Sequence, residues 1–131
     1  MKLLLDTHTF LWHADSHSRL SATAAVLLTD RTNELFLSMA SVWEIAIKTG
    51  LGKLELATPF ISFMTTAITG YGITVMAISL GDCAEYEQHP FPNPGHRDPF
   101  DRMIVVHAQR HGLSLIGTDA AFDAYGITRL W

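Results

Sequence analysis

Four acidic residues stand where a folded chain could gather them for chemistry: Asp6, Glu44, Asp101 and Asp119. Asp6 ends an apolar run at residues 3–5 that predicts a buried strand. Asp119 follows a similar run at residues 115–118. Glu44 and Asp101 fall in the first turn of predicted helices that begin near Ser41 and Asp98.

The chemistry that these acids suggest is metal-dependent hydrolysis. Carboxylates gathered in one cleft repel each other unless a cation neutralises them. Ligand sets made only of oxygen suit Mg²⁺ or Mn²⁺ better than zinc. One or two such ions could activate water against a phosphodiester, as in other metal-dependent hydrolases.

Each acid also has a possible structural role. Ser41 and Glu44 have the spacing of a capping box, in which Glu44 would only serve the helix start. Asp98 precedes Asp101 by three residues and is a good N-cap for the helix that follows. Asp6 has no evident local capping duty at the end of a strand, so the functional reading is strongest for this residue.

Alternating strands and helices must position these residues. We expect strands at residues 3–5, 34–38, 73–78 and 113–117, with a possible fifth at 127–131. We expect helices at residues 22–30, 41–48, 60–69, 80–89 and 101–111, a helical turn after Asp6 and a short helix at 120–125. Residues 89–96 hold three prolines and a glycine and predict a loop.

This order predicts an α/β fold, a three-layer α/β/α sandwich with a central, mostly parallel sheet of four or five strands. In such folds, strand ends and helix starts share one edge of the sheet, and ligands bind there. All four acids are therefore expected to point toward one place.

The composition predicts a single soluble domain over residues 1–131. Hydrophobic residues make up 48% of the chain and charged residues 17%, which favours a well-buried core over disorder. No stretch reaches the length of a membrane span, and a lone Cys83 indicates a reducing, cytoplasmic compartment. The net charge of −4 has the wrong sign for an RNA-binding protein, unless several acids surround bound cations.

Other candidates are weaker. The pairs His13/His17 and His107/His111 have the i, i+4 spacing of zinc ligands but lack the glutamate of the HExxH arrangement, so surface or helix-end positions are the default. His8 could reach the site. The candidates for phosphate contacts are Lys48, Lys53, Arg97 and Arg102, and we expect Trp12, Trp43 and Phe100 to belong to the core rather than to base-stacking platforms.

Several segments resemble one family, the PIN domain, and within it the VapC-type toxins of bacterial toxin–antitoxin modules. They are LLLDTHTFLW at 3–12, SVWEIAIKTGLGKL at 41–54, HRDPFDRMIVVHAQRHGLSLIGTD at 96–119 and FDAYGITRLW at 122–131. Together they cover nearly the whole chain in family order.

The resemblance implies a Rossmann-like fold and an endoribonuclease that requires Mg²⁺ or Mn²⁺. It also implies an RNA substrate, a cognate antitoxin and a homodimer. The family's acids fall on Asp6, Glu44, Asp101 and Asp119 as metal and catalytic residues. The supporting candidates are Asp98, Thr118 and Asp123, and the candidates for substrate phosphates are Lys48 and Arg102.

Two other functions compete. In one, the chain is a non-catalytic binding module whose apolar surface around Trp43, Ile47 and residues 60–64 holds an antitoxin segment. In the other, it is a phosphatase or phosphotransfer domain of the haloacid-dehalogenase or receiver type. That class expects further acids beside the first aspartate, and this chain has Thr7 and His8 there.

Overall fold

The computed structural model describes residues 1–92 and 95–131. At its centre lies a five-stranded sheet in the order β3-β2-β1-β4-β5, with every neighbouring pair parallel. The strands are β1 (Lys2–Leu5), β2 (Glu34–Ser38), β3 (Thr74–Met76), β4 (Ser114–Ile116) and β5 (Arg129–Leu130). The predicted α/β class is confirmed. Part of the predicted loop at 89–96, residues 93–94, lies outside the described residues.

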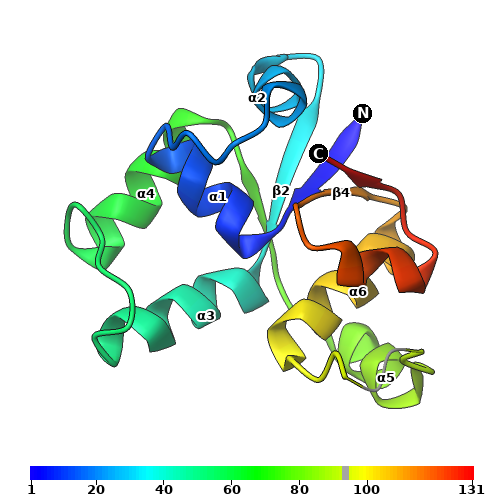
Figure 1. The fold of residues 1–131 in the computed structure, drawn as a ribbon. Helices are drawn as coiled ribbons and strands as arrows, with labels where there is room; N and C mark the ends of the chain where they lie inside the picture. The colour runs from blue at the N-terminus through cyan, green and yellow to red at the C-terminus, as the bar shows by residue number, and fades with distance from the viewer. Residues whose placement is uncertain (93–94) are drawn as a thin grey trace.

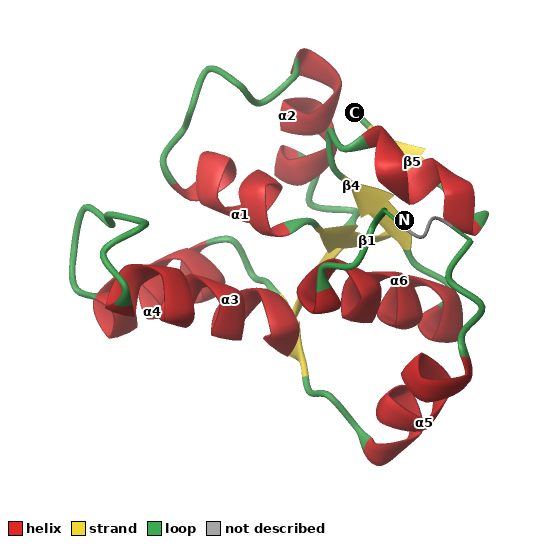
Figure 2. Cartoon of the chain, turned by 60° about the horizontal axis from the view of Figure 1, so that its bottom comes forward, coloured by secondary structure: helices red, strands yellow, loops and turns green. Residues whose placement is uncertain are grey.

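Helices cover both faces of this sheet, as Figure 1 shows. They are α1 (Thr7–Ala14), α2 (Ala22–Thr29), α3 (Met39–Gly50), α4 (Phe60–Gly70), α5 (Leu80–Gln88), α6 (Pro99–His111) and the 3₁₀ helix η1 (Ala120–Tyr125). Helices α1, α2 and α4 lie on one side, and α5 and α6 lie on the other. Helix α3 extends away from the end of β2, and Figure 2 shows its start beside α6.

The three leucines of β1 explain why this strand lies in the middle. All three side chains are fully buried. Leu3 and Leu5 pack in the cluster formed with α1, α2 and α4, whereas Leu4 packs against α6 and η1. Successive residues of a strand face opposite sides, so a run without polar residues fits only a strand covered on both faces. Burial of each leucine stabilises the fold by roughly 1.5–3 kcal/mol.

The start of α3 differs from the prediction. The helix begins at Met39, and its N-cap is Ser38, whose hydroxyl accepts a hydrogen bond from the Ala40 amide at 3.0 Å. Ser38 is also the last residue of β2, so the strand passes directly into the helix. Ser41 therefore lies inside the helix, and the predicted capping box of Ser41 with Glu44 is wrong.

A buried acid–histidine pair ties α5 to α6. Asp82 is 1% exposed and accepts hydrogen bonds from the Ser79 amide at 2.9 Å and from His107 Nε2 at 3.1 Å. Burial alone would raise the pKa of Asp82, but the hydrogen bonds from Ser79 and the contact with His107 outweigh it and lower that pKa. Burial lowers the pKa of His107. The expected surface or helix-end position is therefore wrong for His107. His13 does lie at a helix end, in the last turn of α1, although it is only 7% exposed.

Candidate active site

One small pocket at the carboxyl edge of the sheet collects the candidate acids. Its volume is about 130 Å³. Its walls come from the end of β1, the start of α1, the middle of α3, the start of α6 and the segment after β4. The lining residues are Asp6, Thr7, His8, Glu44, Lys48, Asp98, Asp101, Thr118, Asp119 and Phe122. The four main candidates, the supporting Asp98 and Thr118, and Lys48 therefore lie together.

Asp6 lies deepest of the acids that follow strands. It is 4% exposed and caps α1, with its carboxylate accepting a hydrogen bond from the Thr7 amide at 2.8 Å. Asp6 thus does have a local capping role, contrary to the expectation. Burial, together with the charges of Asp101, Glu44 and Asp119, raises its pKa to about 7, even though the Thr7 amide opposes the shift. A carboxyl with this pKa is partly protonated near pH 7 and can release its proton when a cation binds.

Glu44 is a buried carboxylate with one unused oxygen. It lies in the second turn of α3 and is 4% exposed. Its Oε2 accepts a hydrogen bond from Lys48 Nζ at 2.8 Å, whereas its buried Oε1 has no hydrogen-bond partner among the described residues. A buried polar atom without a partner costs free energy. This unused oxygen favours a ligand in the pocket.

Asp101 lies at the start of α6, in the first turn as predicted. The carboxylate of Asp98 caps this helix and accepts hydrogen bonds from the amides of Phe100 at 2.8 Å and Asp101 at 3.1 Å. The predicted N-cap is thus present. Burial, with the neighbouring charges of Asp98 and Glu44, raises the pKa of Asp101 in spite of its hydrogen bond to a histidine.

Asp119 is exposed and caps η1 by accepting a hydrogen bond from the Ala121 amide at 2.9 Å. The chain between β4 and Asp119 passes very close to Asp6. A Cβ atom on Gly117 would lie 3.1 Å from the Asp6 Cβ. Glycine allows this close approach, because a side chain here would make Asp6 shift by a few tenths of an ångström.

His96 is a site residue that the sequence reasoning missed. It is 9% exposed, and its Nε2 lies 2.9 Å from Asp101 Oδ2. Its Nδ1 lies 2.7 Å from the hydroxyl of Tyr125, a residue of η1. Donor atoms of His96, Asp101 and Asp119 all lie within 4.8 Å of one another. The only sequence signal is the nearness of His96 to Asp101, and nothing local indicates its contact with Tyr125.

Four of the candidates lie outside the pocket lining: Lys53, Arg97, Arg102 and Asp123. The last two hold nearby segments in place. Arg102 donates a hydrogen bond to the His96 carbonyl at 2.9 Å, and its guanidinium lies 4.2 Å from the centre of the Phe91 ring. Asp123 forms a two-pronged ion pair with Arg129 at 2.7 and 2.9 Å. Arg129 also donates to the carbonyl of Gly117, which helps to hold the chain beside Asp6.

The aromatic candidates have different environments. Trp43 is 59% exposed and packs edge-on against Phe100, so the expected core position is wrong for this tryptophan. On α3, Val42 and Ile45 pack against the core cluster, and Trp43 between them points outward. Phe100 is partly buried. Trp12 is partly buried beside His8 and Trp131.

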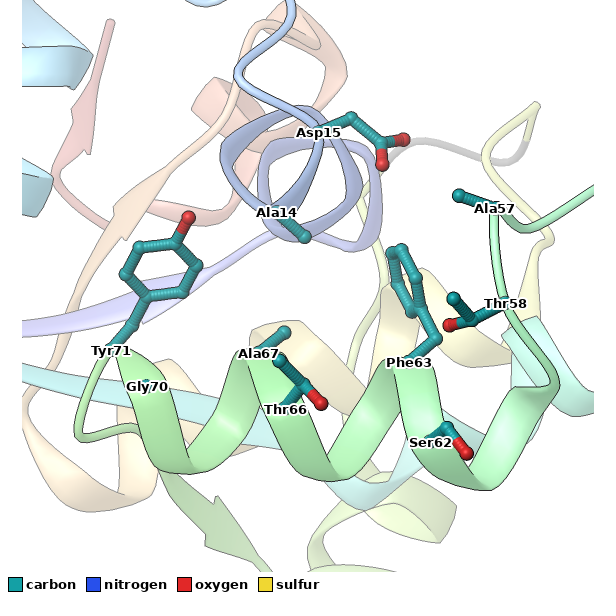
Figure 3. Close-up of a pocket in the computed structure, with 10 residues that line it drawn as sticks. All are labelled: Ala14, Asp15, Ala57, Thr58, Ser62, Phe63, Thr66, Ala67, Gly70 and Tyr71. Atoms are coloured by element: carbon teal, nitrogen blue, oxygen red, sulfur yellow. The ribbon is translucent and has the colours of Figure 1, made fainter.

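A second hollow lies between α1 and α4 (Figure 3). It is an open groove of about 490 Å³. The small side chains of Ala14 and Ala67 face each other across it, while Tyr71 and Phe63 stand toward its two ends. The carboxylate of Asp15 lies at its rim.

The metal-binding capacity of the pocket can be judged from its own atoms. Five carboxylates line it, and the pKa values of Asp6 and Asp101 are raised. One oxygen of Glu44 is buried and unused. These features fit a divalent cation, which would satisfy the unused oxygen and remove the repulsion.

The fold and the pocket together define a class: a Rossmann-like α/β domain with an acidic site at the carboxyl edge of its sheet. The PIN domain family model matches residues 3–127. The chain therefore belongs to the PIN domain family.

Individual relatives agree with this assignment. The chain is 28% identical over 117 residues to Ribonuclease VapC22 of Mycobacterium tuberculosis, covering 89% of this chain and 86% of that protein. The solved structure of M. tuberculosis VapC20, described as a Sarcin-Ricin loop cleaving toxin, is similar with a TM-score of 0.70 at 12% identity, covering 96% of each chain. VapBC2 from Rickettsia felis, bound to a promoter DNA fragment, gives 0.66 at 14% identity, covering 99% and 98%.

Proposed function

We propose that this protein is a metal-dependent endoribonuclease and the toxin of a type II toxin–antitoxin module. The observation that carries the proposal is the meeting of Asp6, Glu44, Asp101 and Asp119 in one pocket, from four separate elements. The similarity to Ribonuclease VapC22 supports RNA as the substrate. The five acids lining the pocket also reconcile the net charge of −4 with RNA, because bound cations would offset them.

Different residues of the pocket would bind the metal, accept a proton and attract the phosphate. Asp6, Asp101 and Asp119 would hold Mg²⁺ or Mn²⁺, which when bound supplies Lewis acidity at the phosphodiester. Glu44 Oε1, which is buried and unused, accepts the proton of the attacking water as its oxygen bonds to phosphorus. The P–O ester bond breaks, and the departing oxygen takes a proton from solvent. Lys48, beside Glu44, can attract a phosphate oxygen.

The test is cleavage of single-stranded RNA by the purified protein with Mg²⁺ or Mn²⁺. We expect Asp6→Asn to lower the rate by about 100-fold or more, since losing even an outer partner of a metal ligand costs 10- to 100-fold. The variant Glu85→Gln removes an exposed acid of α5 and should cleave like wild type. Equal cleavage by wild type and Asp6→Asn would leave only the non-catalytic binding function.

An antitoxin partner is the second part of the proposal. We infer that a helical antitoxin segment enters the groove between α1 and α4 (Figure 3). Its small-residue floor lets a helix approach closely, and Asp15 at the rim favours a basic residue on the partner. Similarity to VapBC complexes supports this kind of partner. The homodimer stays a prediction.

This groove can be blocked without touching the core. Thr66 lines the groove and is exposed, whereas its exposed neighbour Thr65 does not line it. We expect Thr66→Arg to weaken binding of the protein encoded by the neighbouring upstream gene by about 10-fold or more, because the long arginine side chain would fill the space that the partner helix has to enter. Thr65→Arg is the matched control. If both variants bind equally well, the partner docks on another surface.

A further inference from the structure

A nitrogen donor lies beside one of the carboxylates that line the pocket. It belongs to His96, in the segment before α6. Its Nε2 faces Asp101 Oδ2 at 2.9 Å, and one donor atom from each of His96, Asp101 and Asp119 lies within 4.8 Å of the others. Glu44 lines the same pocket as Asp101 and Asp119, and its unused, buried oxygen points independently to a bound ligand there.

We propose that His96 is a metal ligand through Nε2, and that it makes the site prefer Mn²⁺ to Mg²⁺. The proposal rests on the metal site of the proposed function. It goes further by replacing an all-oxygen ligand set with a mixed one. Both ions favour carboxylate, carbonyl and water oxygens, but Mn²⁺ is a first-row transition ion and accepts an imidazole nitrogen more readily than the harder Mg²⁺ does.

The spacing of the donors agrees with an octahedral ion. With bonds of about 2.1 Å, adjacent ligands lie about 3 Å apart and opposite ligands about 4.2 Å apart. The separation of 2.9 Å between His96 Nε2 and Asp101 Oδ2 fits adjacent positions. The donor atoms of His96, Asp101 and Asp119 lie within 4.8 Å of one another, and this range includes the distances between adjacent and between opposite ligands.

The second nitrogen of the His96 ring, Nδ1, contacts an oxygen, as is usual in metal-binding histidines. These residues generally donate their second nitrogen to an oxygen that fixes the tautomer and the ring orientation. His96 Nδ1 lies 2.7 Å from the Tyr125 hydroxyl, and the ring packs edge-on against Phe122. A hydroxyl can donate or accept. Tyr125 can therefore accept from Nδ1–H when Nε2 faces a cation, and donate to Nδ1 when Nε2–H donates to Asp101.

The decisive measurement is pulsed EPR of the purified protein loaded with Mn²⁺. A nitrogen bound directly to Mn²⁺ gives ¹⁴N modulation of the electron spin echo. We expect this modulation in wild type, its retention in the control His17→Gln, which changes an exposed histidine, and its loss in His96→Gln. By calorimetry, His96→Gln should lose about 10-fold or more in Mn²⁺ affinity and much less in Mg²⁺ affinity.

Each outcome decides between the readings. Wild type that binds Mn²⁺ without ¹⁴N modulation overturns the proposal and leaves His96 as a residue that only positions Asp101. Modulation that survives in His96→Gln also overturns it, because another histidine is then the ligand. If wild type binds neither Mn²⁺ nor Mg²⁺, the metal site of the proposed function itself fails. The wild-type spectrum can reject the proposal even if His96→Gln folds poorly.

Discussion

Replacing Asp6 with asparagine is expected to raise the thermal stability of the metal-free protein at pH 8. Burial and three neighbouring acids raise the pKa of Asp6 to about 7 from its ordinary 3.8, which corresponds to roughly 4 kcal/mol. Asparagine keeps the oxygen that accepts the Thr7 amide but carries no charge. If Asp6→Asn regained only ~1 kcal/mol of this unfavourable free energy, its Tm would rise by about 3 °C in a domain of this size.

The effect should depend on pH in one direction. The unfolded chain releases the Asp6 proton near pH 3.8, whereas the folded protein retains it until about pH 7. The folded state thus binds more protons between these values, and the stability contributed by the protonated form disappears as pH rises through 7. The advantage of the variant should therefore be large at pH 8 and small at pH 5.

Differential scanning calorimetry with EDTA at both pH values checks this expectation. Added Mn²⁺ should stabilise wild type at pH 8 more than the variant, because a cation that binds only the folded protein shifts the unfolding equilibrium. Glu85→Gln is the control, since it removes an exposed acid. A lower Tm for Asp6→Asn than for wild type at pH 8 would show that the charge of Asp6 does not destabilise the folded protein.

Replacing Asp82 with alanine is expected to cost about 2–5 kcal/mol, because an unsatisfied buried donor costs about 1–3 kcal/mol and a lost helix cap about 0.5–2 kcal/mol. The change removes the acceptor for His107, which is fully buried. It also removes the acceptor for the Ser79 amide, which is half of the capping box of α5. Helix α5 would then be less firmly attached to α6.

Thermal unfolding of Asp82→Ala and Glu85→Ala measures this loss, since both residues lie on α5. A drop in Tm of about 6 °C or more is expected for Asp82→Ala and little change for Glu85→Ala. RNA cleavage at a temperature where both variants are folded should differ little, because Asp82 does not line the acidic pocket. Equal stability of the two variants would mean that the pair contributes no net free energy.

The sequence predicts the architecture well because local patterns determine it. The three leucines of β1 allow only a strand buried on both faces, and Asp98 with Pro99 sets the start of α6. The start of α3 is misjudged because both Ser38 and Ser41 are good N-caps. The choice between them depends on where β2 ends, and that is set by pairing with β1 and β3.

The site is only partly predictable, because its contacts connect distant segments. The meeting of the four acids follows from the rule that strand ends and helix starts share one edge. The structural roles are distributed differently from the expectation: Asp6 and Asp119 cap helices, whereas Glu44 does not. His96 acquires its place through Tyr125, which is 29 residues away in the chain. No spacing rule indicates such a contact.

The position of β1 in the sheet affects when during synthesis the acidic pocket can be completed. β1 is translated long before its neighbour β4, which begins at Ser114, and Asp119 follows later still. A nascent chain that ends before β4 has an open edge on β1 and an incomplete acidic pocket. Such non-local pairing forms late, because the ends of a long segment must first be brought together. Under the proposed function, the nuclease would stay inactive until almost the whole domain has been translated, which would give the proposed antitoxin time to reach it.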